Sequence, residues 1–379
     1  MIQVRWFRNA LEHRNYWLRF GLMRMHRAGQ IRYSEYPLAS CTDAGFDPAT
    51  AQHEHKHTSV VAVQDGATTR RCIVDSEDSL FWMSPPLLRY ADLYFCSGYN
   101  RAFFEEKTFT PLYNWQQQKE VSFYVQRARD LVRDGGELFD RVRPFVPLAP
   151  EMHMDRRATF AMRRLRNLDH KISTRIRKSQ SWRFEFGDFE ARYRQLLALR
   201  DAPRLYDVVL LDTLWAWPRH RYALHMRLKE LAEAGREIHA RLNWSDLVAL
   251  DGGEDFPVPT QDFPVETGRV GDYERMLASS RLAVFATGLH YGWRMIMTLA
   301  LMWGLPVRSD RLLMEPWFDL NQFEIGWNED LDWHRVSAEL YGLTSDRIVR
   351  IRSHNQAAFD RLLAPEKVAD YFIRAATAG

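Results

Sequence analysis

The sequence has few cysteines, no long apolar run and little net charge. Its three cysteines are an odd number without the spacing of a metal site, which predicts buried thiols in a reducing compartment rather than a disulfide framework. No apolar run approaches the roughly 20 residues that a membrane-spanning helix needs. The first residues also lack the apolar core of a signal peptide. These absences predict a cytoplasmic protein, either soluble or peripheral at the inner face of the membrane.

The composition is typical of a globular protein with ample core. The chain has 379 residues, of which 46% are hydrophobic and 13% aromatic, and this length is sufficient for two domains of ordinary size. No internal repeat or low-complexity segment interrupts it. The formal charge is only +3, but the basic residues are unevenly placed, and between 155 and 182 they greatly outnumber the acids. These basic residues are Arg156, Arg157, Arg163, Arg164, Arg166, Lys171, Arg175, Arg177 and Lys178.

The basic run from 155 to 182 has three interpretations. The first is a solvated helix face at a domain hinge, and the second is a surface that attracts an anionic lipid membrane or a charged acceptor glycan. The third is a nucleic-acid-binding segment. No recognised nucleic-acid motif accompanies it, so nucleic acid is the weakest of the three.

The segment from Gly271 to Asp310 is the most informative part of the sequence. Its residues predict a short helix, a buried strand at 282–285, a glycine loop, a helix that ends at Gly304 and a further strand. In parallel α/β sheets, ligands bind beyond the carboxyl ends of strands, where glycine allows close approach and the next helix presents free N–H groups. The loop from Gly288 to Arg294 occupies such a position.

The first 150 residues predict another α/β unit. Strands are expected at 2–7, 31–36, 59–63, 72–74 and 92–96, a helix at 16–26, and an extended proline-rich segment at 142–150. Three acids, Asp75, Glu77 and Asp78, directly follow one strand, where catalytic groups collect in such sheets. They are candidate bases, together with His13 and Glu35; alternatively they cap the next helix or hold Mg²⁺. His55 and His57 lie at alternate positions that suit a metal, but no third ligand is evident.

A second α/β unit is predicted from Tyr206 onward. A buried strand at 207–211 ends at Asp212 and Thr213, and Arg219, His220 and Arg221 follow before a helix that runs to 234. Another strand is expected at 238–242. After the strand that begins at Leu305 come Glu315, Asn321, Gln322 and Trp327, and three helices between 333 and 376 close the chain.

This order of elements resembles glycosyltransferases of the GT-B fold, which have two facing Rossmann-like domains. The likeness is clearest in the family's "G-x-P-V-x-x-D" strand, which stands here as Gly304, Pro306, Val307 and Asp310. The resemblance implies an α/β fold with an interdomain cleft. It divides the chain into an acceptor-side domain at 1–150, a basic hinge at 151–205 and a nucleotide-sugar-binding domain with closing helices at 206–379.

Within GT-B, the nearest resemblance is to exostosin-like enzymes, which have an Arg followed shortly by Glu-Ala in the helix after the glycine loop. Arg294 is present, but the expected acid falls on Met297 or Thr298. The carboxylate that would hold hydroxyls of the donor is therefore missing or supplied elsewhere. This departure motivates a second hypothesis, a GT-B-like scaffold or glycan- or nucleotide-binding protein without turnover.

The resemblance implies a metal-independent glycosyltransferase that needs no cofactor other than its nucleotide-sugar co-substrate. Its partners are a nucleotide-sugar donor, a glycan or lipid-linked acceptor of a surface-polysaccharide pathway, and an anionic membrane surface. Asp75 or Asp78, with Glu77 as a further candidate, is expected to accept the proton of the acceptor hydroxyl. The expected donor-binding residues are Arg219, Arg221, Gly288, His290, Tyr291, Arg294 and Glu315.

Overall fold

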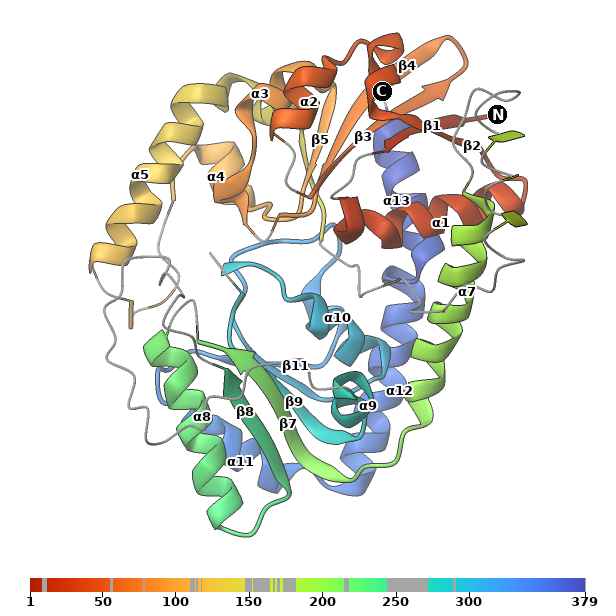
Figure 1. Ribbon diagram of the computed structural model, residues 1–379. Coiled ribbons are helices and arrows are strands. Elements are labelled where there is room, and N and C mark those ends of the chain that lie inside the picture. The colour runs from red at the N-terminus through yellow and green to blue at the C-terminus, as the bar shows by residue number, and fades with distance from the viewer. Residues whose placement is uncertain are drawn as a thin grey trace.

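A computed structural model gives the fold of the chain. It describes residues 1–8, 12–54, 57–77, 79–109, 113, 115–116, 118–146, 152, 164–165, 168, 171–172, 182–214, 218–243, 272–288 and 291–378. These residues form two open sheets with helices on both faces, one sheet in each half of the chain (Figure 1).

The first sheet has six strands in the order β2-β1-β3-β4-β5-β6. Only β3 runs antiparallel to its neighbours, because it forms a hairpin with β4 through a tight turn at Gly66, whose φ of +57° suits glycine. The sequence predicted these strands, apart from the reversed direction of β3. The strands are β1 Gln3–Arg8, β2 Arg32–Pro37, β3 Thr58–Asp65, β4 Thr68–Asp75, β5 Leu93–Cys96 and β6 Val142–Pro144.

Alternating side chains cover the two faces of this sheet with different helices. Val61 and Val74 face α1 (Tyr16–Arg27) and the last helix, α13 (Pro365–Thr377), whereas Val60 and Ile73 pack with α3 (Pro85–Tyr90) and α5 (Gln118–Gly135). Two shorter helices, α2 (Pro48–Glu54) and α4 (Arg101–Glu106), lie near α3 and α5 (Figure 1). The helix α5 was not predicted.

The second sheet has five strands, all parallel, in the order β11-β10-β9-β7-β8. Its strands are β7 Tyr206–Thr213, β8 Ile238–Asn243, β9 Ser280–Phe285, β10 Val307–Asp310 and β11 Ile325–Asn328. One face packs on α8 (Pro218–Glu233) and α11 (His334–Gly342), and the other on α10 (Met295–Met302). The short helix α9 (Tyr273–Ala278) precedes β9, and the sequence predicted every one of these elements except β11.

The strand order reverses at β7. From β7 the chain passes through α8 to β8 on one side, and later through α9 to β9 on the other side. The carboxyl ends of β7 and β9 therefore form the topological switch point of this sheet, where open α/β sheets bind their ligands.

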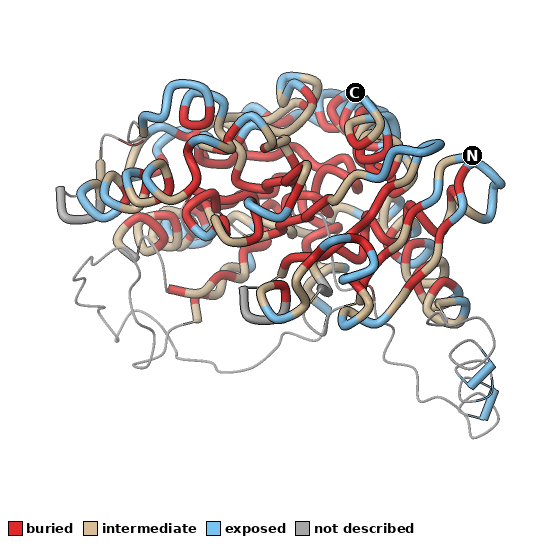
Figure 2. The backbone as a smooth tube through the Cα atoms, turned by 90° about the horizontal axis from the view of Figure 1, so that it is seen from above, coloured by how far each residue is buried: buried red, intermediate tan, exposed pale blue. Residues whose placement is uncertain are grey.

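The last three helices tie the two halves together. After α11 and α12 (Ser345–Leu362), α13 returns to the first sheet, where Phe372 meets Phe95 with ring centroids 4.7 Å apart. Tyr371 donates a hydrogen bond of 2.7 Å to the carbonyl of Pro144. The unpredicted helix α7 (Arg183–Ala198) packs Phe186 and Phe189 into the same core. Buried backbone consequently runs through both halves (Figure 2).

The predicted fold class, an α/β protein with two Rossmann-like domains, is confirmed. The carboxyl edges of the two sheets face one another, and the segments beyond β5 and β10 meet, since the Glu315 amide donates to the Tyr99 carbonyl at 2.7 Å. All three cysteines are free and buried, and burial raises the pKa of the Cys41 thiol to about 11. Most of the basic run, residues 153–163, 166–167, 169–170 and 173–181, lies outside the described residues.

Candidate active site

A buried ion cluster lies at the switch point of the second sheet. Asp212 comes from the carboxyl end of β7, Arg221 from the first turn of α8, and Arg294 from the residue that precedes α10. Arg294 donates both terminal nitrogens to Asp212, at 3.0 and 3.1 Å. Arg221 donates to the same carboxylate at 2.5 Å and to the carbonyl of Thr287 at 2.7 Å. Two guanidinium groups therefore share one carboxylate.

Burial and the neighbouring charges together lower the pKa values of both Asp212 and Arg221. Burial disfavours ionisation of Asp212, but the charges of Arg221 and Arg294 outweigh it and hold the pKa of this carboxyl below its usual value. Burial lowers the pKa of the Arg221 guanidinium; Asp212 counteracts this and Arg294 adds to it. The Arg294 side chain is 20% exposed to solvent. It is therefore the member of the cluster that an anion from solvent can reach.

A second carboxylate, Asp310 at the end of β10, lies beside this cluster but its hydrogen bonds go to other groups. It accepts from His220 Nε2 at 2.9 Å, from the Thr287 amide at 2.8 Å and from Asn328 Nδ2 at 2.9 Å. His220 is fully buried between two indoles, with ring centroids 4.2 Å from Trp115 and 4.9 Å from Trp333. This set of contacts joins the ends of β9, β10 and β11.

Two of the expected donor-binding residues make contacts with the first domain. Arg219 donates to the Trp115 carbonyl at 3.1 Å. Tyr291 is 1% exposed, and its ring packs within the aromatic core of the first domain, 4.9 Å from Tyr124. Its hydroxyl accepts a hydrogen bond of 2.6 Å from Gln116. In this arrangement the Tyr291 ring holds the two domains together and does not face solvent.

The remaining expected donor-binding residues are divided between the loop and a pocket. At Gly288, a Cβ atom would come within 2.8 Å of the Gly292 carbonyl, so this close approach requires glycine. His290 lies outside the described residues. Glu315 lines a separate pocket beyond β10, where one oxygen accepts the Arg101 amide at 2.6 Å. The structure therefore brings Arg221 and Arg294 together and leaves Arg219, Tyr291 and Glu315 at separate contacts.

The three candidate bases follow β4 in the first domain, and two of them are described. Asp75 is 1% exposed and accepts from the Tyr94 hydroxyl at 2.6 Å and from the Glu77 amide at 2.9 Å, so it fixes the turn beyond the strand. The Glu77 side chain is 14% exposed, and its carboxylate lies 3.7 Å from an Arg14 nitrogen. Asp78 lies outside the described residues.

Of the other two candidate bases, Glu35 lies away from this turn, and the side chain of His13 is not described. Glu35 is fully buried and forms a paired ion contact with Arg19, at 2.7 and 2.8 Å. Among the described candidates, Glu77 is more exposed than Asp75 and Glu35.

Sequence reasoning missed the central residue of the cluster, Asp212, although a signal was present. Asp212 ends a buried strand in the same way as Asp75, and its partners Arg221 and Arg294 were already candidates. The stacking of Trp115 on His220 had no sequence signal, because it joins residues 105 positions apart across the domain seam.

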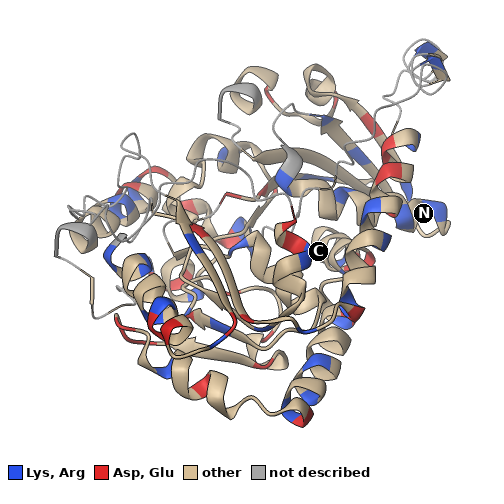
Figure 3. Cartoon of the chain, turned by 60° about the horizontal axis from the view of Figure 1, so that its bottom comes forward, with Lys and Arg blue, Asp and Glu red and all other residues tan. Residues whose placement is uncertain are grey.

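The described part of the chain carries neither a metal-ligand cluster nor a membrane-spanning helix. Its residues contain no group of three or more His, Cys, Asp or Glu side chains that could hold a metal ion. His57 is described, but its possible partner His55 is not. Among the described helices, none combines the length and apolarity needed to cross a membrane. Both signs of charge are spread over the helices in Figure 3.

Fold and site together define a two-domain α/β protein with an arginine-rich cluster at the switch point of its second sheet. No protein-family model matches the chain, and no curated protein matches it. Among solved structures, it is similar to the glycotransferase of kitacinnamycin, with 11% identity over 96% of this chain and 95% of that one. The TM-score of 0.33 is too low for this likeness to support an assignment.

Proposed function

We propose that the chain is a nucleotide-sugar-dependent glycosyltransferase that acts without a metal ion. The observation that carries this proposal is the cluster of Asp212, Arg221 and Arg294 at the switch point, which faces the first domain. Ligands of open α/β sheets bind at this position, and guanidinium groups suit phosphate oxygens in both shape and charge. The phosphates of a sugar nucleotide would lie against Arg294, the more exposed of the two arginines.

The proposed chemistry transfers a glycosyl group to an acceptor hydroxyl. The acceptor oxygen attacks the anomeric carbon, and the bond from that carbon to the phosphate oxygen breaks. Arg294 stabilises the charge that grows on the departing phosphate. In the inverting form of this reaction, the proton of the acceptor hydroxyl passes to Glu77, which lies at the facing edge of the first sheet and is less buried than Asp75.

A non-catalytic binding protein is the second candidate, and one observation favours it. The positions where an acid is expected hold Met297 and Thr298, both fully buried in α10, and Thr298 accepts the Trp293 indole N–H at 2.8 Å. No hydroxyl of a donor can reach an acid there. A protein of this kind would bind the nucleotide sugar but would not turn it over.

The test measures binding and turnover separately on wild type and Glu77→Gln. Uridine, guanosine, thymidine and cytidine sugar nucleotides are titrated by calorimetry, and release of the nucleotide is then followed with a panel of acceptor saccharides. We expect one donor to bind both proteins equally, and Glu77→Gln to slow release by roughly 10²–10⁴-fold. Binding without release in wild type would select the second candidate, and the absence of any binding would contradict both.

A further inference from the structure

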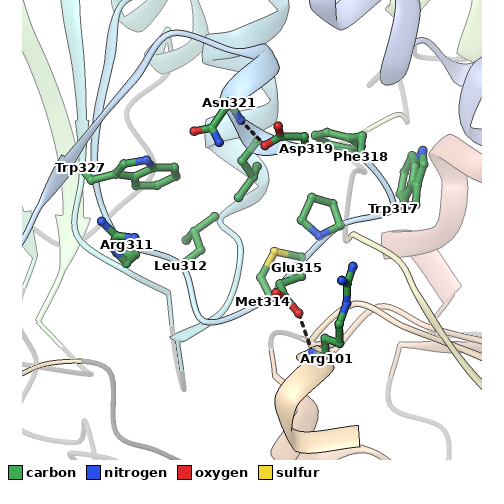
Figure 4. Close-up of a pocket in the computed structure, with 12 residues that line it drawn as sticks. Arg101, Arg311, Leu312, Met314, Glu315, Trp317, Phe318, Asp319, Asn321 and Trp327 are labelled. Atoms are coloured by element: carbon green, nitrogen blue, oxygen red, sulfur yellow. Dashed lines mark hydrogen bonds between the residues drawn. The ribbon is translucent and has the colours of Figure 1, made fainter. Parts of the chain in front are cut away.

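A pocket of about 540 Å³ opens where the connection from β10 to β11 meets the first domain (Figure 4). Its volume is within the range of roughly 300–1,000 Å³ that is typical of small-molecule sites. The connection docks on the first domain through Asn100, which donates to the Leu313 carbonyl at 2.9 Å, and through the contact of the Arg101 amide with Glu315. The lining residues are Arg101, Arg311, Leu312, Met314, Glu315, Pro316, Trp317, Phe318, Asp319, Leu320, Asn321 and Trp327.

Two indoles lie at opposite ends of this pocket (Figure 4). Trp317 is held by stacking on Tyr371, at 4.5 Å and 8° between ring planes, and on Phe145 at 5.9 Å. Trp327 is partly buried, and no aromatic ring of the described chain stacks on it. Trp327 thus offers a flat apolar surface that no ring of the described residues covers, whereas Trp317 forms a rigid end wall.

Polar groups surround the apolar surfaces of the pocket. Asn321 and Asp319 lie on one side, and Arg101 and Arg311 on the other (Figure 4). Asn321 and Arg101 donate hydrogen bonds through their backbone amides, to Asp319 and Glu315. Within the described part of the chain, the side-chain amide of Asn321 and the guanidinium of Arg101 have no hydrogen-bond partner. These donors and acceptors suit a ligand with many hydroxyl groups around an apolar ring face.

We propose that this pocket binds a saccharide ring of the acceptor, an inference that rests on the proposed glycosyltransferase function. A pyranose ring has a flat C–H face that packs on an indole, and its hydroxyls at the ring edge can bond to amide and guanidinium groups. The two arginines are balanced by Glu315 and Asp319, so the pocket has no excess positive charge for a diphosphate. A saccharide therefore fits its chemistry better than a nucleotide phosphate does.

The position of the pocket also favours the acceptor over the donor. The pocket lies beside the ends of β10 and β11, whereas the arginine cluster lies at β7 and β9. Neighbouring strands are about 4.8 Å apart, so β11 is roughly 10 Å from β9. One wall comes from the first domain through Arg101, as expected for a ligand held between the two domains.

The experiment uses the full-length tagged protein on a printed glycan array that carries neutral, amino and acidic oligosaccharides. Wild type is compared with Trp327→Ala, with the exposed-site variant Asn321→Ala, and with Trp82→Ala as a control. Trp82 is an indole 44% exposed in the first domain and outside the pocket. Each protein is also titrated with the sugar nucleotides of the donor panel, and far-UV circular dichroism confirms that each variant is folded.

We expect wild type and Trp82→Ala to bind the same glycans. Both pocket variants should lose about tenfold in affinity, because Trp327→Ala removes an aromatic contact and Asn321→Ala removes a hydrogen bond. Sugar-nucleotide affinity should be equal in all four proteins. If the pocket variants weaken sugar-nucleotide binding instead, the pocket holds the donor and the inference is wrong. If wild type binds a sugar nucleotide but no glycan, the inference fails while the proposed function stands; if it binds neither, both fail.

Discussion

Two buried arginine–carboxylate clusters in this protein differ in their balance of charge. Beside the first sheet, Arg8 and Arg19 are matched by Glu35 and by Glu185 of α7. At the switch point of the second sheet, two arginines contact the single carboxylate of Asp212. Burial works to lower the pKa of Arg19, but Glu35 and Glu185 outweigh it and raise this pKa well above its usual value, whereas the pKa of Arg221 is lowered.

This difference separates a structural cluster from a binding cluster. The matched cluster joins β1, α1, β2 and α7, and its two guanidinium charges are balanced by two carboxylates. Among the described residues, two guanidinium groups of the second cluster contact the one carboxylate of Asp212. Asp310 lies nearby, but its hydrogen bonds go to His220, Thr287 and Asn328, and Arg219 adds a further positive charge at the same edge. The proposed function therefore assigns the donor phosphates to the second cluster, whose Arg294 side chain is 20% exposed, and not to the matched first cluster.

The largest effect on stability is expected from Glu35→Gln, which breaks the matched cluster. Arg19 would keep a full charge in a fully buried position with one carboxylate fewer, so the free energy of unfolding should fall by about 3–5 kcal/mol. Urea denaturation followed by tryptophan fluorescence measures the change. The control is Glu190→Gln, because Glu190 pairs with Arg24 at a partly exposed site and should cost at most about 1 kcal/mol. Equal losses of unfolding free energy in the two variants would show that the cluster at Glu35 contributes no more to stability than a partly exposed ion pair.

A smaller loss, roughly 3 kcal/mol near pH 7, is expected for Asp212→Asn, because Arg294 can turn toward solvent when the carboxylate is neutralised. The loss should depend on pH. The pKa of Asp212 is lowered in the fold, so its stabilisation is complete above the unfolded value of about 3.9 and disappears as the pH falls through the folded value.

Unfolding of Asp212→Asn and wild type at several pH values tests this dependence. The two curves should converge below about pH 4 and stay apart above it. Addition of inorganic pyrophosphate near pH 7 should raise the melting temperature of the variant at least as much as that of wild type, because the anion replaces the missing charge. A variant that pyrophosphate does not stabilise would argue against an anion site.

The smallest effect is expected from Gly288→Ala, which perturbs the loop without changing any charge. The new Cβ would approach the Gly292 carbonyl to 2.8 Å and the Arg294 side chain to 3.5 Å. The loop must shift, which should cost about 1–3 kcal/mol of stability and move Arg294 away from a bound donor. Thermal unfolding and donor titration measure both. Gly187→Ala is the control, since no atom lies within 4 Å of its added Cβ.

The sequence predicted the architecture well because its elements carry strong local signals. Buried strands such as 207–211 and glycine stops such as Gly304 are determined within a few residues. The reversed β3 was not predicted, since a strand buried on both faces has the same residue pattern in either direction. Helix α7 was missed because its buried face is set by contact with α1 and not by a clear local period.

For the candidate site, the sequence selected Arg221 and Arg294 by their positions beside predicted strands and loops, and the structure brings these two candidates to one carboxylate. It did not identify Asp212 as their common partner, because that contact depends on the order of strands in the sheet. The burial of Tyr291 in the aromatic core of the opposite domain was equally inaccessible, since it depends on how the two domains meet. The local sequence pattern therefore predicted the edge of the sheet where the candidate site lies. Which side chains face that edge depends on how the two domains pack together.

The central claim is that the cluster at Asp212 binds the phosphates of a nucleotide sugar, and one calorimetric comparison tests it most directly. Wild type, Arg294→Ala and Arg8→Ala are titrated with the four classes of sugar nucleotide. Arg8 is a matched control, because its side chain is 21% exposed, against 20% for Arg294, and also pairs with a carboxylate. We predict that Arg294→Ala weakens binding by about 10- to 150-fold, the value of a charged hydrogen bond, and that Arg8→Ala leaves it unchanged. Equal affinity in Arg294→Ala and wild type, or an equal loss in Arg8→Ala, would contradict the claim.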